Sequence, residues 1–181
     1  MENVLIINGS EIRSHAKGEL NQAFVDIAIE ELSPHFEILQ TKIRQGYDIK
    51  TEQDKFLNSS FVIFQYPMFW FGTPSILKKY IDDVYEHGIF FEHSDKYGYG
   101  GKLGGRKYMI SATLNAPEDT FNSQDSFAFK DKTIEDVLIQ LHAANAYIGL
   151  TQLPTFIAFN IFRTNIEEKF KEFRQHIRLC V

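Results

Sequence analysis

Cysteine is almost absent from this chain, and three other features are missing with it. The single thiol, Cys180, lies next to the C-terminus and cannot form an internal disulfide, which favours a reducing compartment. The apolar run at residues 4–7 is too short for a signal peptide, and no segment approaches the length of a membrane span. No long basic run occurs and the formal charge is −5, so nucleic acid is not an expected partner. We therefore expect a cytoplasmic protein without stable membrane insertion.

The usual signatures of hydrolytic and metal-dependent catalysis are also missing. Ser10 does not stand in a G-x-S-x-G motif, and the six histidines show no zinc-ligand spacing. The glycines near the N-terminus spell neither G-x-G-x-x-G nor a lysine-bearing phosphate loop. The adjacent Asp82 and Asp83 are interpreted as part of a solvated helix face. No acid–base residue is assigned, and no metal is expected.

What the chain does contain is a regular alternation of strand and helix patterns. Its 181 residues, 44% of them hydrophobic, predict one packed domain over residues 1–181. Apolar runs predict five strands at residues 4–7, 36–41, 61–65, 107–113 and 155–159. Helical spacing predicts helices at residues 19–32, 50–58 (with Phe56 and Leu57 facing inward) and 75–85, and two more around residues 134–141 and 166–177. This pattern predicts a doubly wound α/β fold, with a five-stranded parallel sheet in the order 2-1-3-4-5 and helices on both faces.

The stretch of residues 62–80 reads as a buried strand, an aromatic loop and a helix. Phe69, Trp70 and Phe71 follow the strand directly, where large apolar groups would normally be a liability. Gly72 frees the backbone, and Pro74 stands where a helix can start. Ligands of open α/β sheets bind outside the carboxyl ends of the strands. An aromatic loop at this position therefore favours a flat aromatic ligand.

Two polar segments are predicted to lie beside that loop. Residues 13–18 connect the first strand to a helix, and helix N-terminal amides facing such a loop make an anion site, with positive charge from His15 and Lys17. An ordinary strand–helix connection is the alternative interpretation. At the end of the fourth strand, the Thr113 hydroxyl, the Asn115 amide and the backbone N–H groups of these two residues are expected to bond the edge of a heteroaromatic ring. The long segments 86–105 and 119–132 are interpreted as a functional loop and as a lid, or as covering loops.

The order of several runs resembles one enzyme family. NVLIINGS, HAKGELN, FQYPMFWFGTPSILKKYIDDV, KYGYGGKLGGRKYM and QLPTFIA together resemble the NAD(P)H:quinone oxidoreductases, which are FAD-containing enzymes of flavodoxin-like fold. The resemblance covers most of the chain. It implies FAD as cofactor, NAD(P)H as co-substrate, a quinone or other planar acceptor, and a homodimer. It also implies two-electron, ping-pong transfer of hydride through one shared site.

The resemblance assigns roles to particular residues. Trp70 and Tyr97 are expected in the flavin and substrate pocket, with Trp70 as the anchor. The expected cofactor contacts are His15, Ala16, Lys17, Gly18, Glu19, Leu20, Asn21, Pro67, Met68, Phe69, Trp70, Phe71, Tyr97, Thr113, Leu114, Asn115 and Ala116. Leu114 departs from the aromatic or polar residue expected there in relatives. Candidates for a proton donor to the quinone are Tyr97, Tyr99 and His93, although water can serve instead.

Three other functions remain open at this stage: an electron-carrier flavodoxin, a regulatory subunit of a membrane potassium-efflux system, and an FMN-type azoreductase. The homodimer has support of its own, because many aromatic residues fall outside the periodic core positions. A monomer that exposed all of them would carry an unusually large apolar patch. These residues are Phe69, Phe71, Phe90, Phe91, Tyr97, Tyr99, Phe121, Phe127 and Phe129.

Overall fold

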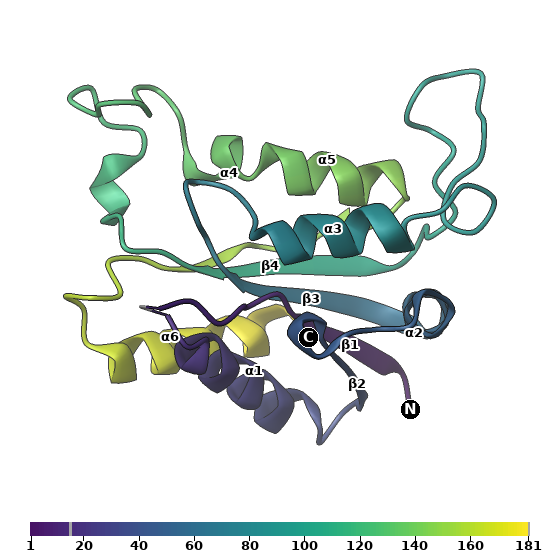
Figure 1. Ribbon diagram of the computed structural model, residues 1–181, viewed down its shortest axis with the longest axis horizontal. Helices are drawn as coiled ribbons and strands as arrows, with labels where there is room; N and C mark the ends of the chain where they lie inside the picture. Colours follow the sequence, from purple (N-terminus) through teal and green to yellow (C-terminus); the bar gives the residue numbers. More distant parts are fainter. Residues whose placement is uncertain (15, 181) are drawn as a thin grey trace.

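The computed structural model describes residues 1–14 and 16–180, and its described strands form one parallel sheet (Figure 1). The strands are β1 (Asn3–Asn8), β2 (Glu37–Lys42), β3 (Ser59–Pro67), β4 (Lys107–Thr113), β5 (Thr151–Gln152) and β6 (Phe156–Ala158). They follow the order β2-β1-β3-β4-β5, and β6 also pairs with β4. The predicted fold class and strand order are confirmed.

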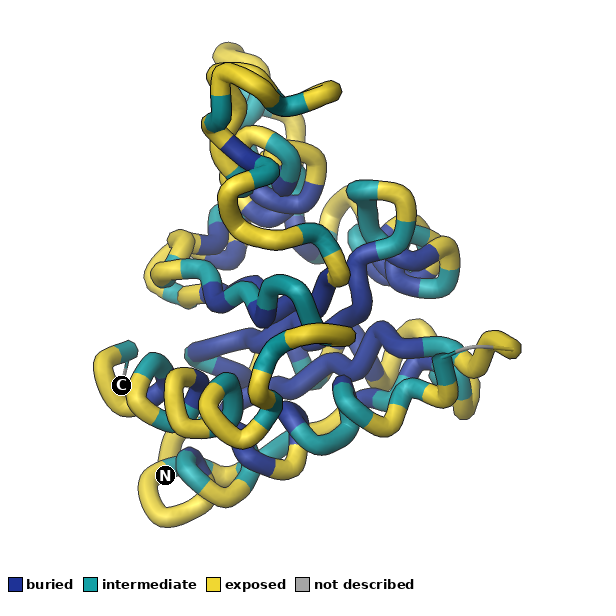
Figure 2. Tube along the Cα trace, turned by 90° about the vertical axis from the view of Figure 1, so that its left-hand side faces the viewer, coloured by how far each residue is buried: buried dark blue, intermediate teal, exposed yellow. Residues whose placement is uncertain are grey.

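Helices cover both faces of the sheet, as predicted (Figure 1). One face carries α1 (Glu19–Leu32) and α6 (Ile166–Cys180), which pack on Val4, Ile6 and Ile63. The other face carries α2 (Ile49–Asn58), α3 (Ser75–Val84), α4 (Ile134–Val137) and α5 (Ile139–Tyr147). Two short 3₁₀ turns, η1 (Ile43–Gln45) and η2 (Glu118–Thr120), complete the elements. The two apolar clusters lie on opposite sides of the central strands, so the buried residues gather in the sheet (Figure 2).

The continuous apolar runs form the central strands because both faces there are covered. Phe64 and Tyr66 of β3 are fully buried on the α3 face, whereas Ile63 is fully buried on the α1 face. Parallel pairing on both sides of β3 satisfies its backbone groups. The carboxyl ends of β1, β3 and β4 therefore meet at one edge of the sheet.

Two details of the predicted elements were wrong. The strand predicted at residues 155–159 is β6, and the short strand β5 before it was not predicted; Pro154, which has no N–H to donate, stands between the two. Leu57, predicted to face inward, is exposed. The inward stripe of α2 is instead Glu52, Gln53 and Phe56, and the Glu52 carboxylate is buried with bonds to Tyr80 (2.7 Å) and Lys55 (2.7 Å).

The long segment of residues 85–106 lies at the amino end of the sheet, opposite the strand ends that carry the predicted site. It links the end of α3 to the start of β4, and Leu103 N donates to Ile148 O at 2.9 Å just after α5. Figure 1 shows this segment and the 119–132 segment as two projections at opposite ends of the molecule. None of the helices in the described residues is both long enough and apolar enough to cross a membrane.

Candidate functional site

A pocket of about 520 Å³ opens at the carboxyl ends of β1, β3 and β4. Four separate parts of the chain build it: the loop before α1 with the first turn of that helix, the end of β3, the end of β4, and the segment that leads into α6. Its lining comprises Glu11, Ala16, Lys17, Gly18, Glu19, Leu20, Asn21, Pro67, Met68, Phe69, Thr113, Leu114, Asn115, Ile161, Phe162 and Ile166. Twelve of these residues are predicted cofactor contacts, so the fold brings most of the predicted set together.

The start of α1 faces the pocket with its amides free of side-chain caps. Gly18 precedes the helix at φ 78°, a conformation that L side chains rarely adopt, and no side chain caps the helix there. A Cβ at Gly18 would lie 2.9 Å from Ser10 Oγ, so only glycine fits this turn without movement. The first N–H groups of a helix lack partners within the helix, and they attract anions. This wall of the pocket is suited to a phosphate group.

The wall of the pocket around the start of α1 carries acidic as well as basic side chains. Lys17 lines the pocket, but Glu11 and Glu19 line it too. Glu11 is paired with Arg13 at 2.6 Å, and the Arg13 guanidinium lies 4.0 Å from the centroid of the Phe69 ring. This contact holds the loop against the aromatic turn. His15, a predicted contact, lies outside the described residues.

A chain of buried hydrogen bonds lies beneath the pocket, and we call its four residues the floor, although only Asn21 and Thr113 line the pocket itself. Ser111 Oγ donates to Gln65 Oε1 at 2.6 Å, and Gln65 Nε2 donates to Asn21 Oδ1 at 2.8 Å. Asn21 Nδ2 then donates to Thr113 Oγ1 at 3.1 Å, while the reverse contact is long at 3.5 Å. Because the contact in which the Thr113 hydroxyl donates to Asn21 Oδ1 is long, that hydroxyl can turn and donate to a ligand instead. The floor is therefore set to meet a hydrogen-bond acceptor on the ligand.

The aromatic loop is a tight turn in which only Phe69 faces the pocket. Phe69 and Gly72 exchange both backbone hydrogen bonds (3.1 and 3.0 Å), and Trp70 (φ 51°) and Phe71 (φ 61°) are both left-handed. This conformation costs roughly 1–2 kcal/mol for each residue with a Cβ. Trp70 is 93% exposed, and Phe71 packs on Phe129 with ring centroids 4.7 Å apart. Neither Trp70 nor Phe71 lines the pocket.

Three further expectations meet a different geometry. Leu114, a predicted cofactor contact, lines the pocket, but its backbone N–H donates to Ala158 O at 3.0 Å and is not available to a ligand. Ala116 is not among the lining residues, and its carbonyl accepts from Asn160 N at 3.1 Å. Tyr97 is 89% exposed and packs on Tyr147 at the amino end of the sheet. Within one chain, Tyr97 lies at the opposite end from the pocket.

Sequence reasoning missed the polar floor residues Gln65 and Ser111 and the wall formed by Ile161, Phe162 and Ile166. Gln65 and Ser111 were detectable in principle, because each is a polar residue inside an otherwise apolar strand. The wall formed by Ile161, Phe162 and Ile166 has no comparable feature in the sequence. Ile166 begins an amphipathic helix like any other, and only the packing of α6 against α1 brings it to the pocket.

Comparison with known proteins shows which family has this architecture. A profile of the flavodoxin-like fold matches residues 2–179 of the chain. The protein belongs to the flavodoxin-like family. Within this family, the NADPH:quinone oxidoreductase MdaB of Haemophilus influenzae is 35% identical, and the alignment covers 97% of each chain. The predicted resemblance to the quinone oxidoreductases is thereby confirmed.

Solved structures of the flavodoxin-like family superpose over nearly the whole chain. A candidate quinone reductase from Klebsiella pneumoniae gives a TM-score of 0.75 at 24% identity, covering 98% of this chain and 82% of the other. The general stress protein 14 of Treponema denticola, solved in complex with FMN, gives 0.76 at 19% identity and covers 100% of both chains. At these identities the likeness establishes the fold alone.

Proposed function

We propose that the protein is an FAD-dependent NAD(P)H:quinone oxidoreductase. The observation that carries this proposal is the pocket at the carboxyl strand ends, where an uncapped helix N-terminus stands between two apolar walls. The name of the Haemophilus relative supports the reaction class. When bound, the flavin supplies the hydride-transfer chemistry, and the chain's residues bind, orient and shield it.

The second apolar wall favours FAD over FMN. Beyond the α1 N-terminus, Ile161, Phe162 and Ile166 extend the pocket, and Phe162 is 75% exposed. A flavin mononucleotide ends at its phosphate, whereas the adenine of FAD needs a flat apolar surface on the far side of the phosphates. The FMN in the Treponema neighbour makes FMN the specific rival. Chromatography of the flavin released by heat decides between them, and full occupancy by FMN would overturn the assignment.

The residues of the first apolar wall suit planar substrates that enter one after the other. Pro67, Met68 and Phe69 present no charge to the pocket, so a nicotinamide ring and a quinone can use the same face. A shared site requires the oxidised nicotinamide to leave before the quinone enters. Steady-state rates with NADPH or NADH and a naphthoquinone should therefore give parallel double-reciprocal lines. Converging lines, or a large one-electron yield, would contradict a shared site.

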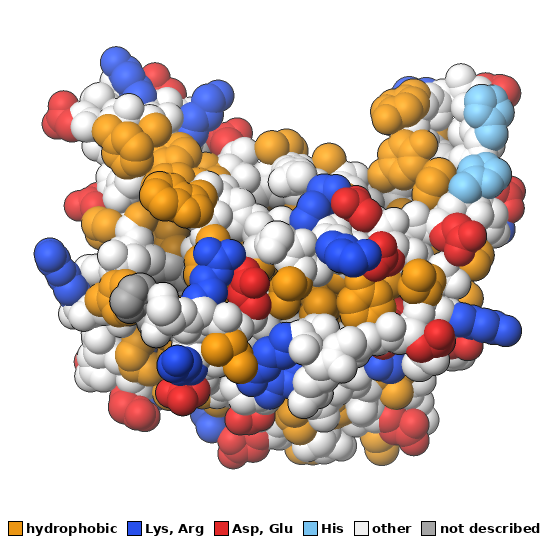
Figure 3. Space-filling model, in the orientation of Figure 1, with side chains coloured by type: hydrophobic (Ala, Val, Ile, Leu, Met, Phe, Trp, Pro, Cys, Tyr) orange, Lys and Arg blue, Asp and Glu red, His pale blue; other side chains and the backbone are white. Residues whose placement is uncertain are grey.

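The homodimer stays part of the proposal, on fewer aromatic residues than the sequence suggested. Phe90 and Phe121 are buried in the chain's own core and do not need a partner. Tyr97, Tyr99 and Phe127 remain exposed, and hydrophobic side chains gather on both projections of the molecule (Figure 3). If Tyr97 contacts a flavin, it must do so across an interface with a second copy.

Light scattering coupled to gel filtration tests the dimer directly. We expect about twice the 21.0 kDa chain mass at micromolar protein. Tyr97→Ala should leave the secondary structure unchanged, because the Tyr97 ring is exposed and, among the aromatic residues that the structure describes, packs on Tyr147 alone. It should lower the catalytic rate, because the proposed interface puts Tyr97 against the flavin of the second copy. A fully active monomer would contradict both the dimer and the shared wall.

A further inference from the structure

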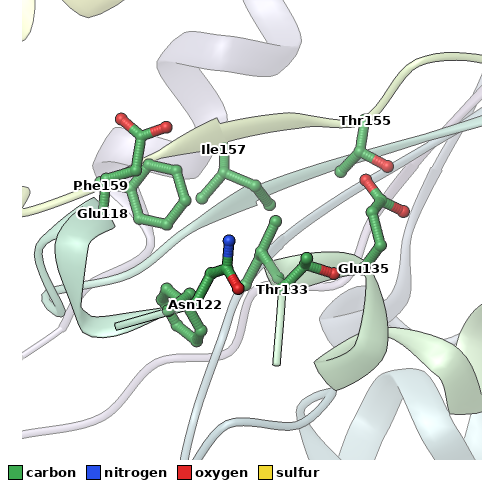
Figure 4. Close-up of a pocket in the computed structure, with 9 residues that line it drawn as sticks. Glu118, Asn122, Thr133, Glu135, Thr155, Ile157 and Phe159 are labelled. Atoms are coloured by element: carbon green, nitrogen blue, oxygen red, sulfur yellow. The ribbon is translucent and has the colours of Figure 1, made fainter. Parts of the chain in front are cut away.

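A second cavity, of about 320 Å³, lies over the α4 face of β6 (Figure 4). Its walls come from η2 and the residues after it, from the start of α4, and from β6 with its flanks. The lining residues are Glu118, Phe121, Asn122, Thr133, Ile134, Glu135, Thr155, Ile157 and Phe159. None of them lines the first pocket, so the proposed flavin site leaves this cavity without a role.

Three buried side-chain polar atoms have no hydrogen-bond partner in the described residues: Thr155 Oγ1, whose residue lines this cavity, His142 Nε2 and Tyr66 Oη. The His142 Nε2 lies 2.8 Å from Glu135 Oε2 without the alignment of a hydrogen bond, and His142 Nδ1 is 2.7 Å from Tyr108 Oη. Figure 4 shows the Thr155 and Glu135 side chains facing each other at one end of the cavity. Unpartnered buried polar atoms are rare and costly, which marks this end of the cavity as a place for a polar ligand group.

The charge around that end is negative and lacks a full cationic partner. Glu118 and Glu135 both line the cavity, and no Lys or Arg does. Within the described residues, the ion-pair contact of Glu135 is to His142, and burial lowers the pKa of that imidazole. Burial therefore favours the neutral imidazole, which is a weaker partner for the carboxylate than a charged side chain. Gln152 Nε2 donates to Glu135 Oε2 at 3.0 Å, which satisfies the carboxylate only in part.

The rest of the cavity is apolar and aromatic. Phe121 and Phe159 pack with ring centroids 5.9 Å apart, and Ile134 and Ile157 complete this side. Aromatic faces attract cations as well as apolar groups. A ligand that fits both ends carries one positive charge on a short apolar or aryl body.

We propose that this cavity is a second ligand site that binds a small primary ammonium compound with an apolar body. An ammonium group has three donors and no acceptor. It can donate to Glu135 and to the orphan Thr155 hydroxyl together, which leaves the hydroxyl hydrogen free to bond the carboxylate. The apolar body then covers Phe121, Phe159 and Ile157.

The test uses benzylamine as probe on the full-length, flavin-loaded protein. Benzyl alcohol and benzoate have the same ring and are the neutral and anionic controls. Methyl NMR of Ile134, Ile157 and Thr155 reports binding in the cavity, whereas the methyls of Leu20, Ile161 and Ile166 report binding in the first pocket. We expect saturable shifts at the first set with benzylamine, and binding at least about tenfold weaker for the two controls.

Two variants probe the polar end, and a third is the matched control. Glu135→Gln removes the charge, and Thr155→Val removes the orphan hydroxyl at nearly constant shape. Each should weaken benzylamine about tenfold. Glu172→Gln removes a carboxylate of similar exposure on α6 and should change nothing.

The proposal is overturned by three results. They are equal binding of all three probes, benzylamine shifts confined to the first pocket, and unchanged benzylamine affinity in Thr155→Val. The Thr155→Val result is independent of Glu135→Gln, so the proposal can still be tested when Glu135→Gln does not fold. Flavin retention is measured in parallel, so a failure of the proposed flavin site is seen separately.

Discussion

The floor and the rim of the first pocket are built in opposite ways. The floor residues Asn21, Gln65, Ser111 and Thr113 are each at least 95% buried and are bonded to one another. Trp70 belongs to the turn beside the pocket, which we call the rim; its side chain is 93% exposed, its backbone is left-handed, and it is not among the residues that line the pocket. The hydrogen bonds of the floor are all made within one chain. In the rim, by contrast, a strained backbone conformation holds an aromatic ring in solvent.

This difference separates stability from ligand binding. A buried polar residue whose partners are all internal is costly to remove, because each partner is then left unsatisfied. An exposed ring on a strained turn contributes little to the fold, so the strain needs another explanation, and strain of this kind clusters at functional sites. We expect changes in the floor to unfold the protein and changes in the rim to affect ligands or a second copy.

The largest effect is expected in the floor, from Gln65→Leu. The change keeps the approximate size of the side chain but leaves Ser111 Oγ and Asn21 Oδ1 without their partners. Buried groups left unsatisfied cost about 1–3 kcal/mol each, so we expect the free energy of unfolding to fall by about 2–4 kcal/mol. Urea denaturation followed by circular dichroism measures this change.

The matched control for the floor is Gln124→Leu, which removes another glutamine from the chain. Gln124 is exposed in the 119–132 segment, and its amide bonds the Asp131 carboxylate. Its replacement should change the free energy of unfolding by less than about 0.5 kcal/mol. Equal destabilisation by the two variants would mean that the floor is not special and that the comparison with the rim fails.

A smaller effect is expected where the α6 wall is attached to α1. Glu31 of α1 accepts from Arg178 Nε at 2.6 Å and from Arg174 Nη1 at 2.7 Å, and only 10% of its side chain is exposed. The hydrogen bonds of Arg178 and Arg174 lower the pKa of Glu31 below its ordinary value of 4.5. Glu31→Gln should lower the free energy of unfolding at pH 7 by about 1–2 kcal/mol.

The pH dependence of this variant has a definite sign. Because the pKa of Glu31 is lower in the folded state, the stabilisation is complete above the unfolded value and is lost as the pH falls through the folded value. The difference between wild type and Glu31→Gln should therefore shrink below about pH 4.5. If the difference in the free energy of unfolding stays constant from pH 7 to pH 3, the ion pairs of Glu31 do not stabilise the contact between α1 and α6.

The sequence predicted the floor's position better than its chemistry. Continuous apolar runs and helical spacing report which residues are buried, and they placed the central strands, α1 and the strand ends that meet at the pocket. Which side chain donates and which accepts in the floor is decided by tertiary structure, so the sequence does not predict it. It depends on the register of β3 against β4, where Gln65 pairs with Ser111, and on the docking of α1 over both strands.

The rim was predicted in composition but not in orientation. The run Phe69-Trp70-Phe71-Gly72 shows that aromatic side chains gather after β3, but the turn geometry decides which ring faces the ligand. Left-handed residues other than glycine, asparagine or aspartate are rare, so propensity does not anticipate them at Trp70 and Phe71. The burial of Phe90 and Phe121 could not be predicted either, because a loop residue packs into the core only through long-range contacts.

The smallest effect on stability, and the sharpest test of the comparison, is expected at Trp70. Trp70→Ala removes an exposed ring and should change the free energy of unfolding by less than about 0.5 kcal/mol. Trp70→Gly also relieves the left-handed conformation and should leave stability unchanged or raise it by up to about 1 kcal/mol. Both variants should retain flavin about tenfold less well, as expected when an exposed aromatic anchor is removed from a binding site.

The control for Trp70 is Leu179→Ala, which truncates another exposed apolar side chain far along α6. Its flavin affinity and its stability should match the wild type. Far-UV circular dichroism and flavin fluorescence, measured on the same samples, separate folding from binding. If Trp70→Ala unfolds the protein but its soluble fraction keeps full flavin, then Trp70 is a structural residue. The strained turn would then support the fold, and the division between floor and rim would not hold.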